Sequence, residues 1–295
     1  MEEFFQQVVS GLATGSIYAS LALALVVIYR TTEVINFSQG EMAMFSTYVA
    51  WQLYAWGLPY WAMFAATLGL SFVGGIVIER VVIRPVERAP ILTIVMVTIG
   101  LLVVLNGLAG WIWSPELKSF PAPPQFPNES FDVAGVAISR QDLGVLAITL
   151  AAVAVVFAFF RYTKLGLAMR AAALNPDASR LMGVRVGWML ALGWGIAAML
   201  GAISGMMVAP FAQLEPNMML TWLIYAFAAA VLGGIESPLG AVVGGLSLGV
   251  GINLLSTYID FITPEIQLPV ALAILLLVLL FRPGGILGHV VVKRV

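Results

Sequence analysis

Nine apolar stretches, separated by short polar segments, constrain this chain more than any other feature of its sequence. Of the 295 residues, 61% are hydrophobic and 10% are charged, whereas a soluble domain carries about 25% charged residues. Inside lipid a backbone must satisfy its own polar groups, so each stretch is expected to be a helix. We therefore predict an all-α polytopic membrane bundle of about eight to ten transmembrane segments, forming a single domain over residues 1–295. The stretches cover residues 5–29, 42–56, 59–78, 91–113, 143–160, 188–213, 220–232, 241–258 and 267–281.

The positions of the basic residues predict how this bundle is oriented. Segments on the cytoplasmic side of a membrane are enriched in Lys and Arg. If the N-terminus lies outside and the C-terminus inside, only Lys118 and Arg140 of the 14 basic residues lie outside. The outer segments instead carry most of the acidic residues. We therefore predict a multi-pass protein with its N-terminus out and its C-terminus in.

Two short polar segments interrupt the apolar sequence, one in each half of the chain. Gly- or Pro-interrupted segments at corresponding places are the best sequence indication of a central pathway. The candidate pathway residues are Asn36, Ser38, Gln39, Gly40 and Glu41 in the first segment, and Gly233, Gly234 and Glu236 in the second. The alternative is that both segments are ordinary turns, with each acid favoured by the dipole at a helix N-terminus.

Residues 161–187 form a basic segment that is too polar to lie in lipid. Residues 165–173 are typical of a short helix that ends at Asn175-Pro176. Asp177 is a plausible N-cap for a second helix, 178–182, which Gly183 would close. Such a pair can enter a groove on a partner protein; the alternative is that it lies on anionic lipid. The sequence has no P-loop, so any ATP would be bound by a separate subunit.

Few chemical functions are open to this sequence. It has no Cys and a single His, His289, so thiolate and zinc sites are excluded and no catalytic set is present. Membrane orientation accounts for the basic segments, which removes the argument for nucleic acid. The polar residues within the spans are mostly uncharged, which favours a small neutral or zwitterionic solute. Asn106 and Asn253 are expected to form hydrogen bonds between helices.

The Pro-rich segment 114–141 is predicted to lie on the periplasmic side. Its prolines exclude a continuous helix, and residues 131–139 are typical of a short extended piece. Two interpretations remain open for this loop. It either docks an external solute-binding protein or closes the outer face of the bundle.

Several motifs resemble, in the same order, the permease subunits of branched-chain amino acid ABC importers of the LivH-like type. They are GLATGSIYASLALALVVIYRTTEVINFSQGEMAMFSTYVA (11–50), TKLGLAMRAAALNPDASRLMGVRV (163–186), LGGIESPLGAVVGG (232–245) and RPGGILG (282–288). The resemblance implies a bacterial inner-membrane importer subunit that works by alternating access. It also implies a cytoplasmic ATPase-coupling segment containing Gly166, Arg170, Asn175, Pro176, Ala178, Met182 and Gly183.

The same resemblance implies the partners of the chain. They are a second related permease in a heterodimer, two ATP-binding subunits, and a periplasmic or lipid-anchored solute-binding protein. ATP and Mg²⁺ would be bound by those subunits, and no cofactor by this chain. Relatives of the family carry urea and short amides, so an importer of those solutes is one alternative. A stand-alone facilitator or channel is another.

Overall fold

The fold is described from a computed structural model of the chain. The structure describes residues 2–32, 34–127, 129–133, 136–282 and 284–288. Pro283 and His289 therefore lie outside the described residues.

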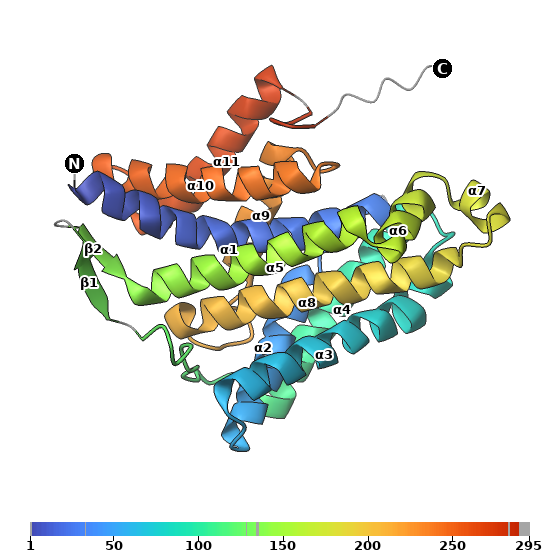
Figure 1. Cartoon of the computed structure of the whole chain (residues 1–295), viewed down its shortest axis with the longest axis horizontal. Coiled ribbons are helices and arrows are strands. Elements are labelled where there is room, and N and C mark those ends of the chain that lie inside the picture. The colour runs from blue at the N-terminus through green and yellow to red at the C-terminus, as the bar shows by residue number, and fades with distance from the viewer. Residues whose placement is uncertain (1, 33, 128, 134–135, 283, 289–295) are drawn as a thin grey trace. The chain divides into compact units, whose positions relative to one another are not determined.

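Each predicted apolar stretch corresponds to a helix within the described residues (Figure 1). These helices are α1 (Glu2–Thr32), α2 (Gln39–Ala55), α3 (Tyr60–Ile78), α4 (Ile91–Trp113), α5 (Arg140–Tyr162), α8 (Val186–Ala212), α9 (Leu220–Gly233), α10 (Pro238–Tyr258) and α11 (Pro264–Phe281). Seven of them are long and apolar enough to cross a membrane, while α2 and α9 have 17 and 14 residues. The predicted helical membrane fold is confirmed, and its orientation stays a prediction.

The remaining elements lie between these helices. The α-helix α3 ends at Ile78, as predicted. Helical structure continues beyond it as a π-helix, η1 (Glu79–Ile83), and a 3₁₀ turn, η2 (Arg84–Val86). The wider π turn brings residues five apart together, and Arg84 forms a salt bridge of 3.2 Å with Glu79. Strands β1 (Ser130–Val133) and β2 (Val136–Ser139) form an antiparallel hairpin, which confirms the predicted extended piece.

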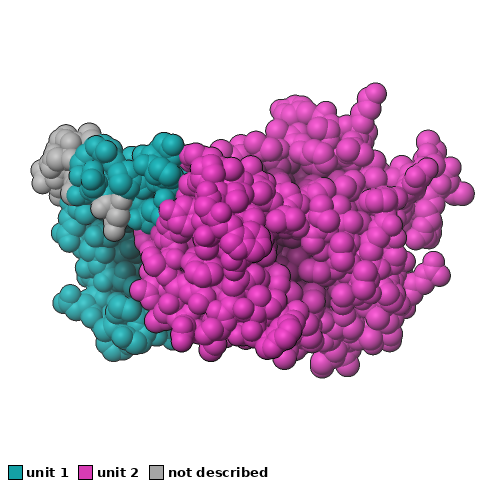
Figure 2. Space-filling view, turned by 90° about the horizontal axis from the view of Figure 1, so that it is seen from below, with its two compact units in different colours: residues 1–26, 122–150, 221–295 teal, residues 27–121, 151–220 magenta. Residues whose placement is uncertain are grey.

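The helices gather into two compact units, which Figure 2 colours separately. Unit 1 comprises residues 1–26, 122–150 and 221–295, and unit 2 comprises residues 27–121 and 151–220. Each unit is assembled from distant parts of the chain, and α1, α5 and α9 each contribute to both. That residues 1–295 act as one transmembrane domain stays a prediction.

In unit 1, small residues bring α1 and α10 close together. A Cβ on Gly11 would lie 2.8 Å from the Cα of Val250, and a Cβ on Gly15 would lie 2.9 Å from the carbonyl oxygen of Gly245. Gly-x-x-x-Gly spacing permits this approach of two backbones. One helical turn further along α1, the ring of Tyr18 stacks on Tyr225 of α9, with 4.9 Å between centroids.

In unit 2, α8 is the central helix and packs along both α2 and α3. Its glycines face these neighbours. A Cβ on Gly195 would lie 2.9 Å from the ring of Phe72 on α3, and a Cβ on Gly205 would lie 2.8 Å from the carbonyl oxygen of Ala43 on α2. Because these glycines have no side chain, α2 and α3 approach α8 closely. The start of α2 thereby lies against the middle of α8.

Candidate functional site

The segment before α2 forms a buried polar cluster in unit 2. Asn36, Ser38 and Gln39 are each at most 1% exposed. The Oδ1 of Asn36 accepts hydrogen bonds from the Ser38 backbone N–H (3.1 Å) and hydroxyl (2.7 Å), while its Nδ2 donates to Gln39 Oε1 (3.3 Å). The Gln39 amide in turn donates to the Ala197 carbonyl of α8 at 2.9 Å. These bonds fix the entry of the chain into α2 and attach it to α8.

Ser38 occupies the N-cap position of α2, but its hydroxyl bonds to Asn36 and does not cap the helix. Gly40 and Glu41 follow in the first turn and are both buried. The five residues predicted from this motif are therefore together at one place. An irregular backbone at such a position is tolerated in membrane proteins where it is buried in protein or lines a cavity.

Glu41 is the acid of this cluster and is only 2% exposed. Its Oε2 accepts a hydrogen bond from the Nδ2 of Asn106 on α4 at 3.4 Å. The same nitrogen donates to the Pro216 carbonyl (3.0 Å) and to Asn217 Oδ1 (3.1 Å), in the turn that precedes α9. A single NH₂ group has two hydrogens for these three acceptors, so the long bond to Glu41 is the weakest of the three. Asn106 thus joins α2, α4 and the turn at 216–219.

Among the described residues, the carboxylate of Glu41 has no salt bridge. A buried acid in a membrane segment is costly and is by default a candidate for function. Its place in the first turn of α2 also suits the helix dipole. The position of Glu41 therefore agrees both with a pathway residue and with an acid that stabilises a helix N-terminus. The sequence predicted that Asn106 forms an interhelical hydrogen bond, which is confirmed, but not that it contacts Glu41.

The second polar segment lies in unit 1, between α9 and α10. Gly233 and Gly234 are buried, Glu236 is exposed, and Gly234 has a φ of +106°. The Leu232 and Gly233 carbonyls accept hydrogen bonds from the backbone N–H groups of Ile286 (2.8 Å) and Leu287 (3.0 Å). The C-terminal segment therefore satisfies the last carbonyls of α9. A pathway role for Gly233, Gly234 and Glu236 stays a prediction.

The segment 161–187 contains two short helices, α6 (Lys164–Leu174) and α7 (Pro176–Leu181), as predicted. Thr163 caps α6 by accepting the Gly166 N–H at 2.9 Å. The cap of α7 is Asn175, whose Oδ1 accepts the Ala178 N–H at 2.9 Å. The prediction that Asp177 is this cap is therefore wrong. Pro176 occupies the first helical position, where a missing N–H costs nothing, and this places the cap one residue earlier.

The other predicted coupling residues have distinct environments. Gly166 is buried and packs against the end of α5, where a Cβ at position 166 would lie 2.6 Å from the Cα of Phe160. The Nε of Arg170 is buried and has no hydrogen-bond partner among the described residues. At the end of α7, Met182 is 84% exposed and its neighbour Leu181 is 89% exposed. Gly183 closes the helix with a φ of +80°, as predicted.

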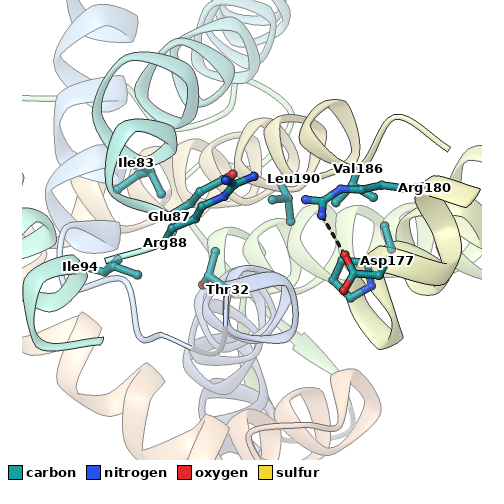
Figure 3. A pocket seen from close by; sticks show the side chains of 11 residues that line it. Thr32, Ile83, Glu87, Arg88, Ile94, Asp177, Arg180, Val186 and Leu190 are labelled. Carbon is teal, nitrogen blue, oxygen red and sulfur yellow. Dashed lines mark hydrogen bonds and ion pairs between the residues drawn. The ribbon is translucent and has the colours of Figure 1, made fainter. Parts of the chain in front are cut away.

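An open cavity of about 340 Å³ lies beside α7 in unit 2 (Figure 3). Pro176, Asp177 and Arg180 of α7 contribute to its lining. In the view of Figure 3, Arg180 and Asp177 lie on one side, joined by an ion pair of 2.9 Å, and Glu87 and Arg88 extend toward the middle from the other. The segment 161–187 thus carries both an exposed apolar tip and a charged recess.

Residues 7–279 of the sequence match the family described as the permease component of the branched-chain amino acid transport system. The chain belongs to this family. The permease is 32% identical to the high-affinity branched-chain amino acid transport system permease protein LivH of Salmonella typhimurium, over 99% of its own length and 98% of the relative. BraD of Pseudomonas aeruginosa, which carries the same description, is also 32% identical, over 99% and 98% of the two chains.

A more distant relative is the probable branched-chain amino acid transport permease protein LivH of Methanocaldococcus jannaschii. It is 28% identical over 91% of the permease and 87% of its own length. The solved structure of PsaBC from Streptococcus pneumoniae in complex with Fab covers 93% of the permease, at 12% identity and a TM-score of 0.48.

Membership of this family assigns the chain a role within an ABC transporter. The permease is a multi-pass membrane protein, homologous to bacterial inner-membrane permeases, and is not itself an ATPase. Such a component implies ATPase and solute-binding partners. Within the described part of the chain, no group of three or more His, Cys, Asp or Glu residues could hold a metal ion.

Proposed function

We propose that this permease imports branched-chain or other neutral amino acids across the inner membrane by alternating access, driven by two ATP-binding subunits that dock on residues 161–187. A second, related permease would complete the membrane pathway as a heterodimer. A periplasmic or lipid-anchored binding protein would deliver the solute, with residues 114–141 as its contact. The relatives LivH and BraD are branched-chain amino acid transport permeases, and their 32% identity over nearly the whole chain supports this solute class.

The continuity from α7 through α8 to α2 is the observation that carries the proposal. The chain runs from the capped helix α7 through a turn at 182–185 into α8, which also packs against α6. On α8, the Ala197 carbonyl holds Gln39, two residues before Glu41. A force applied to α7 would therefore reach the buried polar cluster through the short turn at 182–185 and then along α8.

The exposed apolar residues of α6 and α7 and the polar residues of the buried cluster support the same proposal. Leu174, Leu181 and Met182 are 80%, 89% and 84% exposed, so α6 and α7 present large apolar side chains that a partner protein would cover. At the other end of this connection, Asn36, Gln39 and Glu41 are buried amide and carboxylate groups, which a polar solute would meet only after movement of α8 exposes them. These groups suit a small zwitterion better than a polyanion, because the cluster holds no cationic side chain.

The test is uptake of labelled L-leucine by proteoliposomes that contain the complete assembly, with ATP inside and the binding protein outside. Leu181→Glu combined with Met182→Glu is expected to abolish ATP-dependent uptake and co-purification of the ATP-binding subunits, while the permease still inserts. Phe261→Glu is the matched control, since Phe261 is 75% exposed but lies in the loop between α10 and α11. Normal coupling in the double variant would refute the assignment of the coupling segment.

Two further measurements separate this function from its alternatives. Competition by urea or acetamide, with no competition by L-leucine or L-valine, would identify an amide importer instead. Uptake by the purified permease alone, without ATP or partner subunits, would identify a facilitator. We expect neither result.

A further inference from the structure

The cavity beside α7 has the size of a small-molecule site. Its volume of about 340 Å³ lies within unit 2 and is lined by the end of α1, residues 83–94, α6, α7 and the start of α8. Pockets that bind small molecules range from about 300 to 1,000 Å³. The residues of the buried polar cluster do not line it, so it is a separate site.

One part of the lining is aliphatic. Ile83 and Ile94 approach from the segment around η2 and the start of α4, and Val186 and Leu190 come from the first turns of α8 (Figure 3). Ile83 and Val186 are 3% and 5% exposed, so this wall belongs to the packed interior of the unit. It provides a fixed apolar surface for a branched hydrocarbon side chain.

The other part of the lining carries both signs of charge. Asp177 and Arg180 form an ion pair of 2.9 Å on α7. Glu87 and Arg88 lie on the segment that faces them, and among the described residues their side chains form no salt bridge or hydrogen bond. The side chains of Glu87 and Arg88 are exposed to solvent. Each can therefore bind an oppositely charged group of a ligand with little loss of solvation free energy.

We propose that this cavity binds the imported aliphatic amino acid as a zwitterion on the receiving side, and that the bound solute slows further import. An arginine would take the carboxylate, an acid would take the ammonium group, and the aliphatic wall would hold the side chain. This inference rests on the proposed function, since it takes its ligand from the proposed cargo and its location from the proposed orientation.

A ligand in this cavity would act on coupling because it joins two separate elements. It would contact α7 on one side and the segment 84–90 on the other. A ligand that binds one arrangement of two elements better than the other stabilises that arrangement, by an amount that grows with the logarithm of ligand concentration above Kd. A solute that holds α7 against residues 84–90 therefore opposes any displacement of α7 that the ATP-binding subunits drive.

The experiment compares proteoliposomes of the complete assembly that are preloaded with different unlabelled compounds and then assayed for uptake of labelled L-leucine. The compounds are L-leucine, 4-methylpentanoate, which lacks the ammonium group, and 3-methylbutylamine, which lacks the carboxylate. Preloaded L-leucine is expected to lower the initial rate about fivefold or more, the lower end of ordinary site-to-site coupling. The two singly charged compounds are expected to lower it less than about twofold, because each leaves one charged group of the cavity without a partner.

Variants of the chain then locate the effect. The double variant Glu87→Gln/Arg88→Gln is expected to reduce the ratio of rates between empty and L-leucine-loaded vesicles to below about twofold, as expected for loss of the coupling. Arg282→Gln is the matched control, because Arg282 is an exposed cation after α11 that lies outside residues 161–187 and does not line the cavity, and it should keep the wild-type ratio. Binding of labelled L-leucine to the purified permease with its ATP-binding subunits gives a second readout, which the double variant should lose.

Four results would overturn this inference. One is equal inhibition by all three compounds, another is an unchanged ratio in the double variant, and the third is no inhibition by preloaded L-leucine. A fourth is loss of uptake into empty vesicles by the double variant, because the cavity would then be part of the docking surface for the ATP-binding subunits. In each of these cases wild-type uptake of L-leucine still supports the proposed function, which fails only if the wild-type assembly imports no aliphatic amino acid.

Discussion

Replacement of Asn175 by alanine tests the structure at the point where it differs most clearly from the sequence prediction. In the structure the Oδ1 of Asn175 accepts the Ala178 N–H at 2.9 Å and starts α7. Loss of such an N-cap costs about 1 kcal/mol, which is a factor of about five in the equilibrium between formed and frayed helix. The effect is expected to be local, because Asn175 is exposed and α7 has six residues.

Hydrogen exchange at the Met182 amide measures this equilibrium directly, since this N–H donates to the Ala178 carbonyl at 3.2 Å within the last turn of α7. Asn175→Ala should lower its protection about fivefold, and Asn175→Ser should keep most of it, because serine is also a good N-cap. Asp177→Ala should lower it at most about twofold, since it removes only an exposed i,i+3 ion pair that contributes about 0.2–0.5 kcal/mol.

The consequence for transport follows from the population of the formed helix. If the ATP-binding subunits require α7 to be formed, their apparent affinity falls with the formed fraction, by up to about fivefold. The reasoning is refuted if Asn175→Ala leaves the Met182 amide as protected as in the wild type. It is also refuted if Asp177→Ala has the larger effect, since Asp177 would then be the cap that the sequence predicted.

Three further substitutions test the packing and the polar network in unit 2. Gly205→Ala should lower the thermal stability of the purified protein, because its Cβ would lie 2.8 Å from a backbone oxygen of α2. Such overpacking costs about 1–3 kcal/mol. The control Gly107→Ala should not lower the stability, because a Cβ there meets open space on α4. Arg84→Ala should destabilise the protein by about 1–3 kcal/mol in chemical unfolding, because the buried Glu79 carboxylate loses its salt bridge. Arg84→Ala combined with Glu79→Gln should recover part of that loss. Asn106→Ala should reduce uptake in the vesicle assay while the protein still inserts, because the cluster around Glu41 loses its connection to α4 and to the turn at 216–219. Equal stability of the two glycine variants, no recovery in the double variant, or wild-type uptake by Asn106→Ala would contradict the corresponding argument.

The sequence predicted the helices well where local chemistry sets their bounds. The predicted stretch 91–113 is the observed α4, because Pro90 fixes its start and the apolar run ends at Trp113. The short extended piece predicted at 131–139 corresponds to strands β1 and β2, but their antiparallel pairing was not predicted. The cap of α7 was missed although the signal was present, since Pro in the first helical position indicates that the preceding residue is the N-cap.

Folding alone decided which buried polar groups meet. The sequence indicated that Asn106 needs a partner in an apolar span, but not that its amide would contact Glu41 and, 111 residues along the chain, Asn217. It placed Glu41 and Glu236 in similar motifs, yet the first is 2% exposed and the second is exposed.

The sequence by itself determined the class of the protein, the positions of its helices and the two short helices of the segment 161–187. These depend on the length and composition of contiguous stretches, which interact with lipid and with near neighbours. The tertiary structure decided the polar cluster around Glu41, the attachment of Gln39 to α8 and the cavity beside α7. Each of these joins residues that are distant along the chain, and such pairs become neighbours only when glycine-lined helices such as α8 let their partners approach.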